Sequence, residues 1–255
     1  MLDFNPSAFK RSKTARIIAG AIDAGLAKRM KEKAVSRSKY KSDGNYGIGA
    51  GIVGAPCKRK SQYDYLGTMP DEEYEYNPRM QRIWDRGHMG EELMAGWLRE
   101  AGYDLHTTKA DGRQFGFRVA GGKFKGYYDG IFHGGPGIEE PTLWENKWLG
   151  NKSYRQVEQN GGEKAKPEYF AQVQTYMAYE DLTAFPTVWT AVNADTCEIH
   201  IELIPFSKTK AQKATDTAVG IIQDSEAGAI RPRVSQDPEY WLCKGCEYRR
   251  RCHGR

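Results

Sequence analysis

Two charged side chains inside an apolar, strand-like segment restrict what this chain can fold into. The segment LWENKWL, residues 143–149, carries Glu145 and Lys147 among leucine and tryptophan residues. Because side chains alternate between the two faces of a strand, both charges point the same way. Burying charges is costly, and a cluster of them in an apolar setting usually marks a functional site. The preceding apolar run, YYDGIF, adds Asp129.

An acid on one strand and Glu-x-Lys on the next together indicate a particular chemistry. Such carboxylates hold a divalent cation and an activated water against a phosphodiester. Upstream, in the helix expected from Pro78 to about Gly102, His88 and Glu91 are three residues apart and share a face. A single histidine on a helix is more often structural. A histidine with an acid one turn later, just before the acid-bearing strands, favours a metal contact.

Length and composition fit a soluble α/β protein. A chain of 255 residues fits one large domain or one domain with extensions, and 39% apolar residues can fill a core. We divide it into a basic helical extension, 1–43, and a single domain, 44–255. No apolar run approaches membrane-spanning length, and the first residues lack the apolar centre of a secretory signal. We therefore expect a cytoplasmic protein.

Positive charge gathers at both ends of the chain. Residues 1–43 hold eleven Lys/Arg against four acids, and residues 241–255 hold five against one. Basic ends around an acidic centre suit a polyanion bound at its flanks and cut at a metal. The alternative is that these ends are only solvated tails.

The pattern of apolar residues predicts alternating helices and strands. A helix over 13–35 repeats apolar residues every fourth position (Ile18, Ile22, Leu26, Met30), and we expect this stripe to pack on the domain. A DNA-facing or partner-binding helix is the alternative. The remaining elements are a loop over 69–78, a meander over 104–133 whose last strand is FKGYYDGIF, a strand over 142–149, a polar loop over 150–166, a helix from Pro167, strands over 186–193 and 197–206, and a helix over 207–226. Together they predict an α/β core with a central mixed β-sheet flanked by helices.

Five cysteines remain to be explained. In a reducing compartment structural disulfides are rare, and the Cys-x2-Cys-x5-Cys spacing of Cys243, Cys246 and Cys252 is typical of metal or cluster ligation. For Cys197, at the start of an expected strand, a buried thiol is the simplest interpretation.

Taken in order, these motifs resemble the PD-(D/E)XK nuclease superfamily and, within it, the RecB-like nucleases. The matching features are the Gly-His pair ending at His88, Gly-x-x-Asp ending at Asp129, Glu-x-Lys over Glu145–Lys147, and Gln-x-x-x-Tyr over Gln172–Tyr176. The resemblance covers about residues 50–252. It implies a restriction-endonuclease-like core with an N-terminal helix and a C-terminal cysteine cluster.

The resemblance also implies roles for these residues. Asp129, Glu145 and His88, with the main-chain carbonyl of Asn146, would bind one or two Mg²⁺ or Mn²⁺ ions. Lys147 would orient the attacking water and stabilise the transition state. Gln172 and Tyr176 would position the scissile strand, Tyr176 by stacking on a base, and Glu91 would be an outer-sphere partner of the metal.

The cysteines are similar to those of a subgroup that includes the AddB nuclease domain and the CRISPR-adaptation nucleases. There, one cysteine before the core and three after it hold a [4Fe–4S] cluster. In this chain the four would be Cys57, Cys243, Cys246 and Cys252. A zinc site with the same ligands is the alternative.

The expected activity is that of a metal-dependent DNA exonuclease, of the phage type, acting on single-stranded or end-processed DNA in recombination, repair or phage replication. Two alternatives are a CRISPR-adaptation nuclease that trims spacer precursors and a DNA-binding subunit without catalysis. DNA is the expected partner, together with a recombination, helicase or integrase protein.

Overall fold

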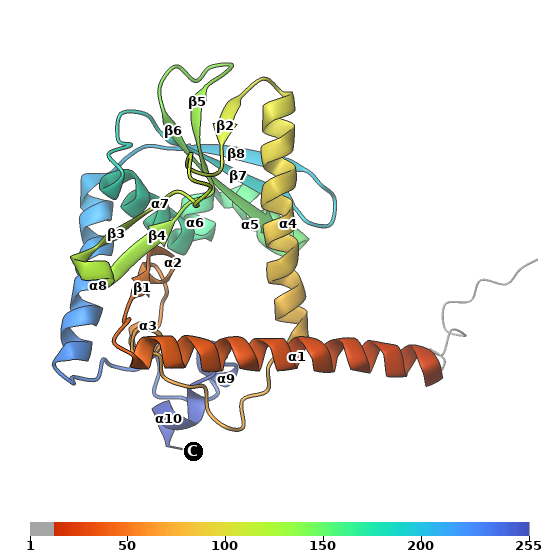
Figure 1. Cartoon of the computed structure of the whole chain (residues 1–255), viewed down its shortest axis with the longest axis vertical. Helices are drawn as coiled ribbons and strands as arrows, with labels where there is room; N and C mark the ends of the chain where they lie inside the picture. Colours follow the sequence, from red (N-terminus) through yellow and green to blue (C-terminus); the bar gives the residue numbers. More distant parts are fainter. Residues whose placement is uncertain (1–12, 255) are drawn as a thin grey trace, which may run out of the picture.

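The computed structural model describes residues 13–254, and a five-stranded sheet forms its centre (Figure 1). The strand order is β2-β5-β6-β7-β8. β6 and β7 run parallel and the other neighbours run antiparallel, so the sheet is mixed, as the sequence predicts. The strands are β2 (Asp104–His106), β5 (Gly130–Gly134), β6 (Thr142–Leu149), β7 (Thr187–Asn193) and β8 (Ile199–Ile204).

A smaller sheet of three strands, ordered β1-β4-β3, lies beside the first one. β3 (Gly116–Val119) and β4 (Phe124–Tyr127) form the hairpin that Gly121-Gly122 predicts, and β1 (Ile48–Gly49) pairs parallel to β4. A short helix, η2 (Ala120–Gly122), makes the turn, with both glycines at positive φ. β4 of the small sheet is followed directly by β5 of the large sheet.

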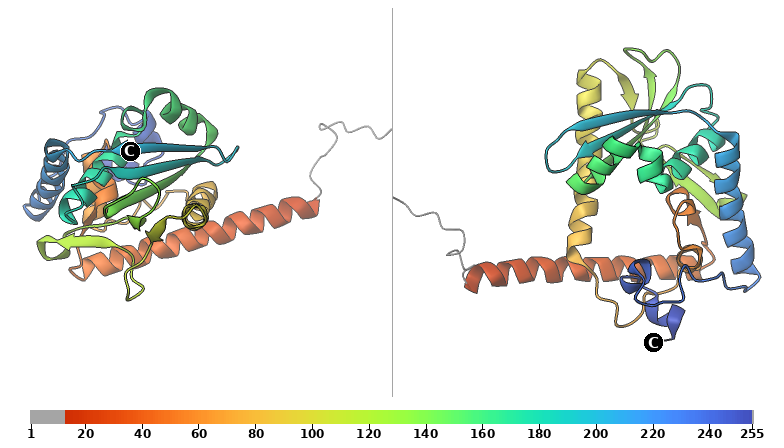
Figure 2. Two further views of the ribbon diagram at one scale, coloured as in Figure 1. Left: turned by 90° about the horizontal axis from the view of Figure 1, so that it is seen from above. Right: turned by 180° about the vertical axis from the view of Figure 1, so that it is seen from behind.

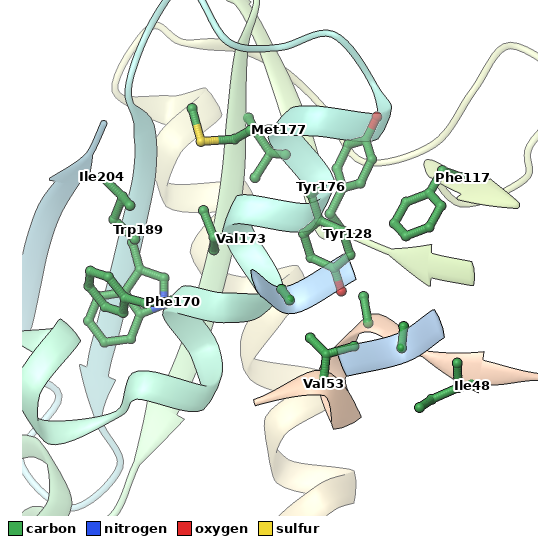
Figure 3. Packing of buried hydrophobic residues seen from close by; sticks show 14 of the residues in the cluster. Ile48, Val53, Phe117, Tyr128, Phe170, Val173, Tyr176, Met177, Trp189 and Ile204 are labelled. Carbon is green, nitrogen blue, oxygen red and sulfur yellow. The ribbon is translucent and has the colours of Figure 1, made fainter. Parts of the chain in front are cut away.

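Helices cover both faces of the large sheet. α4 packs its buried residues against one face, and α7 packs on the other face with most of the hydrophobic core. Figure 3 shows part of that larger cluster, in which Phe170 packs against Trp189 and Tyr176 lies near Tyr128. The helices are α1 (Lys13–Ser42), α2 (Ala50–Val53), α3 (Lys58–Tyr65), α4 (Pro78–Glu100), α5 (Asn151–Asn160), α6 (Gly162–Ala165), α7 (Pro167–Tyr179), α8 (Lys208–Glu226), α9 (Trp241–Lys244) and α10 (Arg249–His253).

Local sequence explains where α4 begins and how closely it packs. The Asn77 side chain accepts a hydrogen bond from the Arg79 N–H, and Pro78 occupies the first turn, where its missing N–H is harmless. Midway along the helix, Gly90 lies against Trp148 of β6 so closely that a Cβ there would overlap the indole. α4 therefore approaches the sheet closely at Trp148, the residue that follows Lys147 on β6.

The N-terminal helix departs from the prediction in length and packing. α1 extends to Ser42, and its N-terminal turns project beyond the body of the molecule (Figures 1 and 2). Met30 is buried, but Ile18 and Ile22 are more than half exposed, so the expectation that the whole apolar stripe packs on the domain is wrong. The reason is that α1 meets α4 only along its middle, where Arg29 forms an ion pair with Asp85.

The expected strand FKGYYDGIF is two strands in two different sheets. The chain leaves β4 at Tyr127 and enters β5 at Gly130. Between them, Tyr128 is fully buried and its hydroxyl donates a hydrogen bond to Glu180 Oε2 at 2.8 Å. Gly130 then passes close to β2, where a Cβ would lie 2.7 Å from the His106 carbonyl oxygen. This break places Asp129 at the junction of the sheets.

Two further expectations are wrong. The polar segment 150–166 is not a loop but forms α5 and α6, because Tyr154 and Val157 bury one narrow face of α5 while its other residues are solvated. Cys197 is not a buried thiol. It is exposed, with φ of 62°, in the turn between β7 and β8.

The C-terminal segment packs against α3 and the loop that follows it. The Gln62 side chain donates to the Ala229 carbonyl at 2.6 Å and accepts from the Arg231 N–H at 3.0 Å. Further along, the Asp71 N–H donates to the Glu247 carbonyl at 2.8 Å. Segments far apart in the sequence are thus held together. No helix within residues 13–254 has the length and apolar character needed to cross a membrane.

Candidate active site

Hydrogen bonds link Lys147 directly to Glu145 and, through the Asn146 main chain, to Asp129. Lys147 Nζ donates to Glu145 Oε1 at 2.5 Å and to the main-chain carbonyl of Asn146 at 2.9 Å. The Asn146 N–H in turn donates to Asp129 Oδ2 at 2.8 Å. Glu145 and Lys147 therefore lie on the same face of β6, as the alternation of side chains along a strand predicts. The break between β4 and β5 brings Asp129 next to them.

Only the main chain of Asn146 reaches this group. Its side-chain oxygen accepts a hydrogen bond from the Thr190 hydroxyl at 2.8 Å, on the opposite face of β6. The Asn146 carbonyl, which the resemblance implies as a metal ligand, is here the acceptor for Lys147. The Asn146 backbone thus links the two acid-bearing segments through one donor and one acceptor.

Burial and mutual repulsion make the three acids of the site difficult to ionise. Glu145 is 1% exposed, and burial together with the charge of Asp129 raises its pKa to about 8. Burial also raises the pKa of Asp129 against the opposing influence of Lys147. On α4, burial and Asp129 raise the pKa of Glu91 to about 7. Carboxyl groups that repel one another in a buried site would bind a cation favourably.

The same surroundings keep Lys147 positively charged. Burial lowers the pKa of Lys147, but the charges of Glu145 and Asp129 outweigh that effect, so the pKa is raised overall. Lys147 Nζ also lies 5.4 Å from the ring centre of Tyr169, a cation–π distance. Tyr169 is a neighbour of the site that the sequence did not single out. Its only signal was its place one turn before Gln172 on the same helix.

One carboxylate oxygen of the site is buried without a partner. Glu145 Oε1 accepts from Lys147, whereas Glu145 Oε2 is inaccessible to solvent and has no hydrogen bond within the described chain. A buried carboxylate oxygen without a donor is costly, and it is the atom on which a cation would act. Among residues 13–254, however, no three His, Cys, Asp or Glu side chains are placed so that together they could hold a metal ion.

His88 and Glu91, both on α4, differ in how strongly their charges influence the acids. The charge of Asp129 raises the pKa of Glu91, and the charge of Glu91 in turn raises the pKa of Glu145. The charge of His88 acts on Asp129 as the smallest of the influences that set its pKa. The structure therefore places Glu91 electrostatically nearer to the acids than its sequence-based role as an outer partner suggested.

Gln172 and Tyr176 lie on α7, behind the acids. The Gln172 side-chain amide donates a hydrogen bond to the Tyr176 hydroxyl. Tyr176 is 1% exposed, and its ring packs between Phe117 and Tyr128 (Figure 3). Because the ring has no open face, the expectation that it stacks on a base is wrong. Burial, followed by the charge of Glu145, raises the Tyr176 pKa well above its ordinary value, so the hydroxyl stays protonated.

The cysteines gather at a second place, distant in sequence from the acids. A cavity of about 90 Å³ is lined by four of them, Cys57, Cys243, Cys246 and Cys252. Cys57 caps α3 by accepting the Lys60 N–H at 3.4 Å, and Arg59 Nη1 lies 3.8 Å from Cys252 Sγ. The fifth cysteine, Cys197, lies outside this cavity, in the turn after β7.

Comparison with known proteins gives a likeness of fold. No family model matches the chain, and no curated protein matches it. Among solved structures, the alkaline exonuclease LHK-Exo from Laribacter hongkongensis is similar over 71% of this chain and 89% of its own, with 17% identity and a TM-score of 0.50. Its complex with dAMP covers 74% and 92% at 15% identity, with a TM-score of 0.49. The chain thus has the mixed α/β fold of an exonuclease-like nuclease.

Proposed function

We propose that this protein is a divalent-metal-dependent DNA exonuclease. The observation that carries the proposal is the group of Glu91, Asp129, Glu145 and Lys147 at the junction of the two sheets, in which Glu145 is fully buried and the others are partly buried. The fold is that of a protein described as an alkaline exonuclease, and a second structure of that protein holds dAMP. Single-stranded or end-processed DNA is the substrate class that we propose.

The donor set fits Mg²⁺ or Mn²⁺. Carboxylate and carbonyl oxygens are the ligands these ions prefer, and Glu145 Oε2 is a buried oxygen without a donor. Asp129, Glu145 and the Asn146 carbonyl would hold the ion directly, and Glu91 and His88 would complete its surroundings. When bound, the ion would lower the pKa of a water and neutralise charge on the phosphate.

The chain's own residues prepare the site for this chemistry. Lys147, kept charged by the acids, would donate to the attacking water or to the phosphoryl oxygens as charge develops. The Asn146 N–H holds Asp129 in place at 2.8 Å. Gln172, fixed by Tyr176, presents its amide for positioning the DNA strand. Tyr176 acts through Gln172 and has no contact of its own with a base.

Cleavage of end-labelled linear DNA tests the proposal. With Mg²⁺ or Mn²⁺ the protein should release nucleotides from an end, and EDTA should stop the reaction. Asp129→Asn and Lys147→Ala should lower the rate by roughly 10²–10³-fold, the usual loss when one group that stabilises the transition state is removed. Undiminished cleavage by either folded variant would overturn the mechanism, and cutting of closed circular DNA would overturn the assignment as an exonuclease.

A matched control is available on the surface. Glu163 and Lys210 form an exposed ion pair of the same chemical types that includes no residue of the candidate site. Glu163→Gln and Lys210→Ala should cleave at the rate of the unchanged protein. Their behaviour separates the loss of a particular lysine or acid from a general effect of altered charge.

We also propose that Cys57, Cys243, Cys246 and Cys252 hold a [4Fe–4S] cluster, with Zn²⁺ as the alternative. The support is that these four thiols line one cavity and that Arg59 and the Lys60 N–H approach two of the sulfur atoms. Such groups stabilise thiolates. When bound, the cluster would supply a covalent link between the two ends of a single domain over 44–255.

A further inference from the structure

The outer face of the β3–β4 hairpin carries aromatic and basic side chains together. Phe117 and Phe124 point inward, where their rings pack 5.1 Å apart. The alternate positions point outward. Arg118 pairs with Lys125 across the hairpin, and Tyr127, two residues further along β4, is 48% exposed.

Contacts to α1 extend this face. Tyr127, and more weakly Tyr40 of α1, raise the pKa of the Arg118 guanidinium, and Tyr40 is 49% exposed. The guanidinium therefore lies near two exposed tyrosines. We call Tyr40, Arg118, Lys125 and Tyr127 the hairpin platform.

The platform is positively charged and lies directly before the acids of the site. Neither Arg118 nor Lys125 forms an ion pair with a carboxylate of residues 13–254. Nearby, burial lowers the pKa of Lys41 to about 8, and the charges of Arg37 and Lys125 lower it further, against the influence of Asp64. From Tyr127 the chain passes through the buried Tyr128, whose hydroxyl is bonded to Glu180, directly to Asp129, so the platform and Asp129 belong to one continuous segment.

We propose that the hairpin platform binds one strand of single-stranded nucleic acid and leads it to Asp129. Tyr127 stacks on a base, while Arg118 and Lys125 contact the phosphates on either side of it. Aromatic faces joined to basic side chains are the usual means of holding a strand without reading its sequence. Charge complementarity favours a polyanion over an apolar partner at this face. The inference rests on the proposed nuclease function and adds the surface that holds the substrate strand.

Binding of a fluorescent single-stranded oligonucleotide, measured by anisotropy in EDTA so that no cleavage occurs, tests the proposal. Tyr127→Ala should weaken binding about 5- to 150-fold, the range for loss of one stacked base, whereas Tyr127→Phe should bind like the unchanged protein. Arg118→Ala should weaken binding and reduce the slope of log K against log salt by about one phosphate contact. Phe185, 37% exposed in the loop before β7, supplies the matched control, since Phe185→Ala should have no effect.

Changing the oligonucleotide instead of the protein gives a second test of stacking. An oligonucleotide without bases has nothing to stack, so Tyr127→Ala and the unchanged protein should bind it equally. Equal binding of the normal strand by Tyr127→Ala and the unchanged protein would overturn the platform. Equal losses in Tyr127→Phe and Tyr127→Ala would overturn stacking in favour of the hydroxyl.

Cleavage assays keep the two proposals separate. If the unchanged protein cleaves DNA with Mg²⁺ and Tyr127→Ala binds and cleaves as well, the platform fails while the nuclease function stands. If the unchanged protein binds the strand through Tyr127 and Arg118 but cleaves with neither metal, the nuclease function fails while the platform stands. Thermal melting of each variant confirms that it is folded.

Discussion

Glu145 carries a carboxylate into a position that solvent scarcely reaches. Its pKa is raised to about 8 because burial and Asp129 oppose its ionisation, and Lys147 offsets only part of this cost. A carboxyl whose pKa is higher in the folded than in the unfolded state stabilises the protein fully below its ordinary pKa of 4.5, and this stabilisation is lost as pH rises through 8. The metal-free protein therefore stores unfavourable electrostatic energy at neutral and alkaline pH.

This leads to a prediction for the metal-free protein. In EDTA, its urea midpoint should rise as pH falls from about 8 to about 5. In Glu145→Gln the rise should be smaller, because the amide cannot ionise. A divalent cation should raise the midpoint most at pH 8, where the acids are ionised. Identical pH profiles for Glu145→Gln and the unchanged protein would show that Glu145 is not the group responsible.

The sequence predicts the position of an individual side chain where the alternation or helical repeat of its own element determines it. Glu145 and Lys147 share a face because strands alternate, and Asp129 was recognised from its apolar setting. The prediction that Tyr176 stacks on a base was wrong because Phe117 and Tyr128 cover its ring. These two residues come from other elements, so the sequence around Tyr176 does not show the contact. Tyr169 escaped notice for the same reason, since its relation to Lys147 arises only when α7 docks on β6.

Among the elements, α4 depends on one close approach to the sheet. Gly90 has no room for a Cβ against Trp148, whereas Gly96, six residues later in the same helix, has no atom within 4 Å of an added Cβ. Two chemically identical substitutions in one helix should therefore have opposite effects on stability.

Urea unfolding of the two variants checks this prediction. Gly90→Ala should lower the free energy of unfolding by about 1–3 kcal/mol, because the extra methyl group overpacks the contact with Trp148. Gly96→Ala should raise it by about 0.5–1 kcal/mol, the gain expected from helix propensity. Gly90→Ala should also slow cleavage, since α4 carries His88 and Glu91. A stabilising Gly90→Ala would mean that α4 and β6 separate more easily than their packing implies.

Elements with a strong period were predicted well, and those without one were not. Pro78 identifies the start of α4, and Pro167 that of α7. The segment that forms α5 has few apolar residues, so its helical period is weak, and only docking of Tyr154 and Val157 stabilises it. The two strands within FKGYYDGIF could not be separated because nothing local distinguishes a continuous strand from one that changes sheets.

At the scale of the whole molecule, the four cysteines of the cavity come from segments about 190 residues apart. Closing so long a loop would stabilise the fold by roughly 4–5 kcal/mol in a chain-entropy description. Sequence spacing alone grouped Cys243, Cys246 and Cys252, and the link to Cys57 needed the resemblance to cluster-containing nucleases. The structure brings all four to one cavity.

Anaerobic purification with metal analysis checks the cluster. The protein should be brown and contain about four iron atoms per chain, the content of a [4Fe–4S] centre. Cys252→Ser should lose colour and iron and melt at a lower temperature. Cys197→Ser, in the exposed turn after β7, is the matched control and should retain all three properties. A colourless protein with one zinc and no iron would establish the zinc alternative.

The pairing of Gln62 with Ala229 and Arg231 also determines when the protein can finish folding during translation. Gln62 and Arg231 are separated by 169 positions. At usual elongation speeds a ribosome needs roughly 10–30 s to add that many residues. Throughout this interval the nascent chain holds α3 without its C-terminal neighbours. The residues around Arg231 therefore complete, late in synthesis, a structure that begins at α3, and chaperones would have most to protect in the nascent chain that still lacks them.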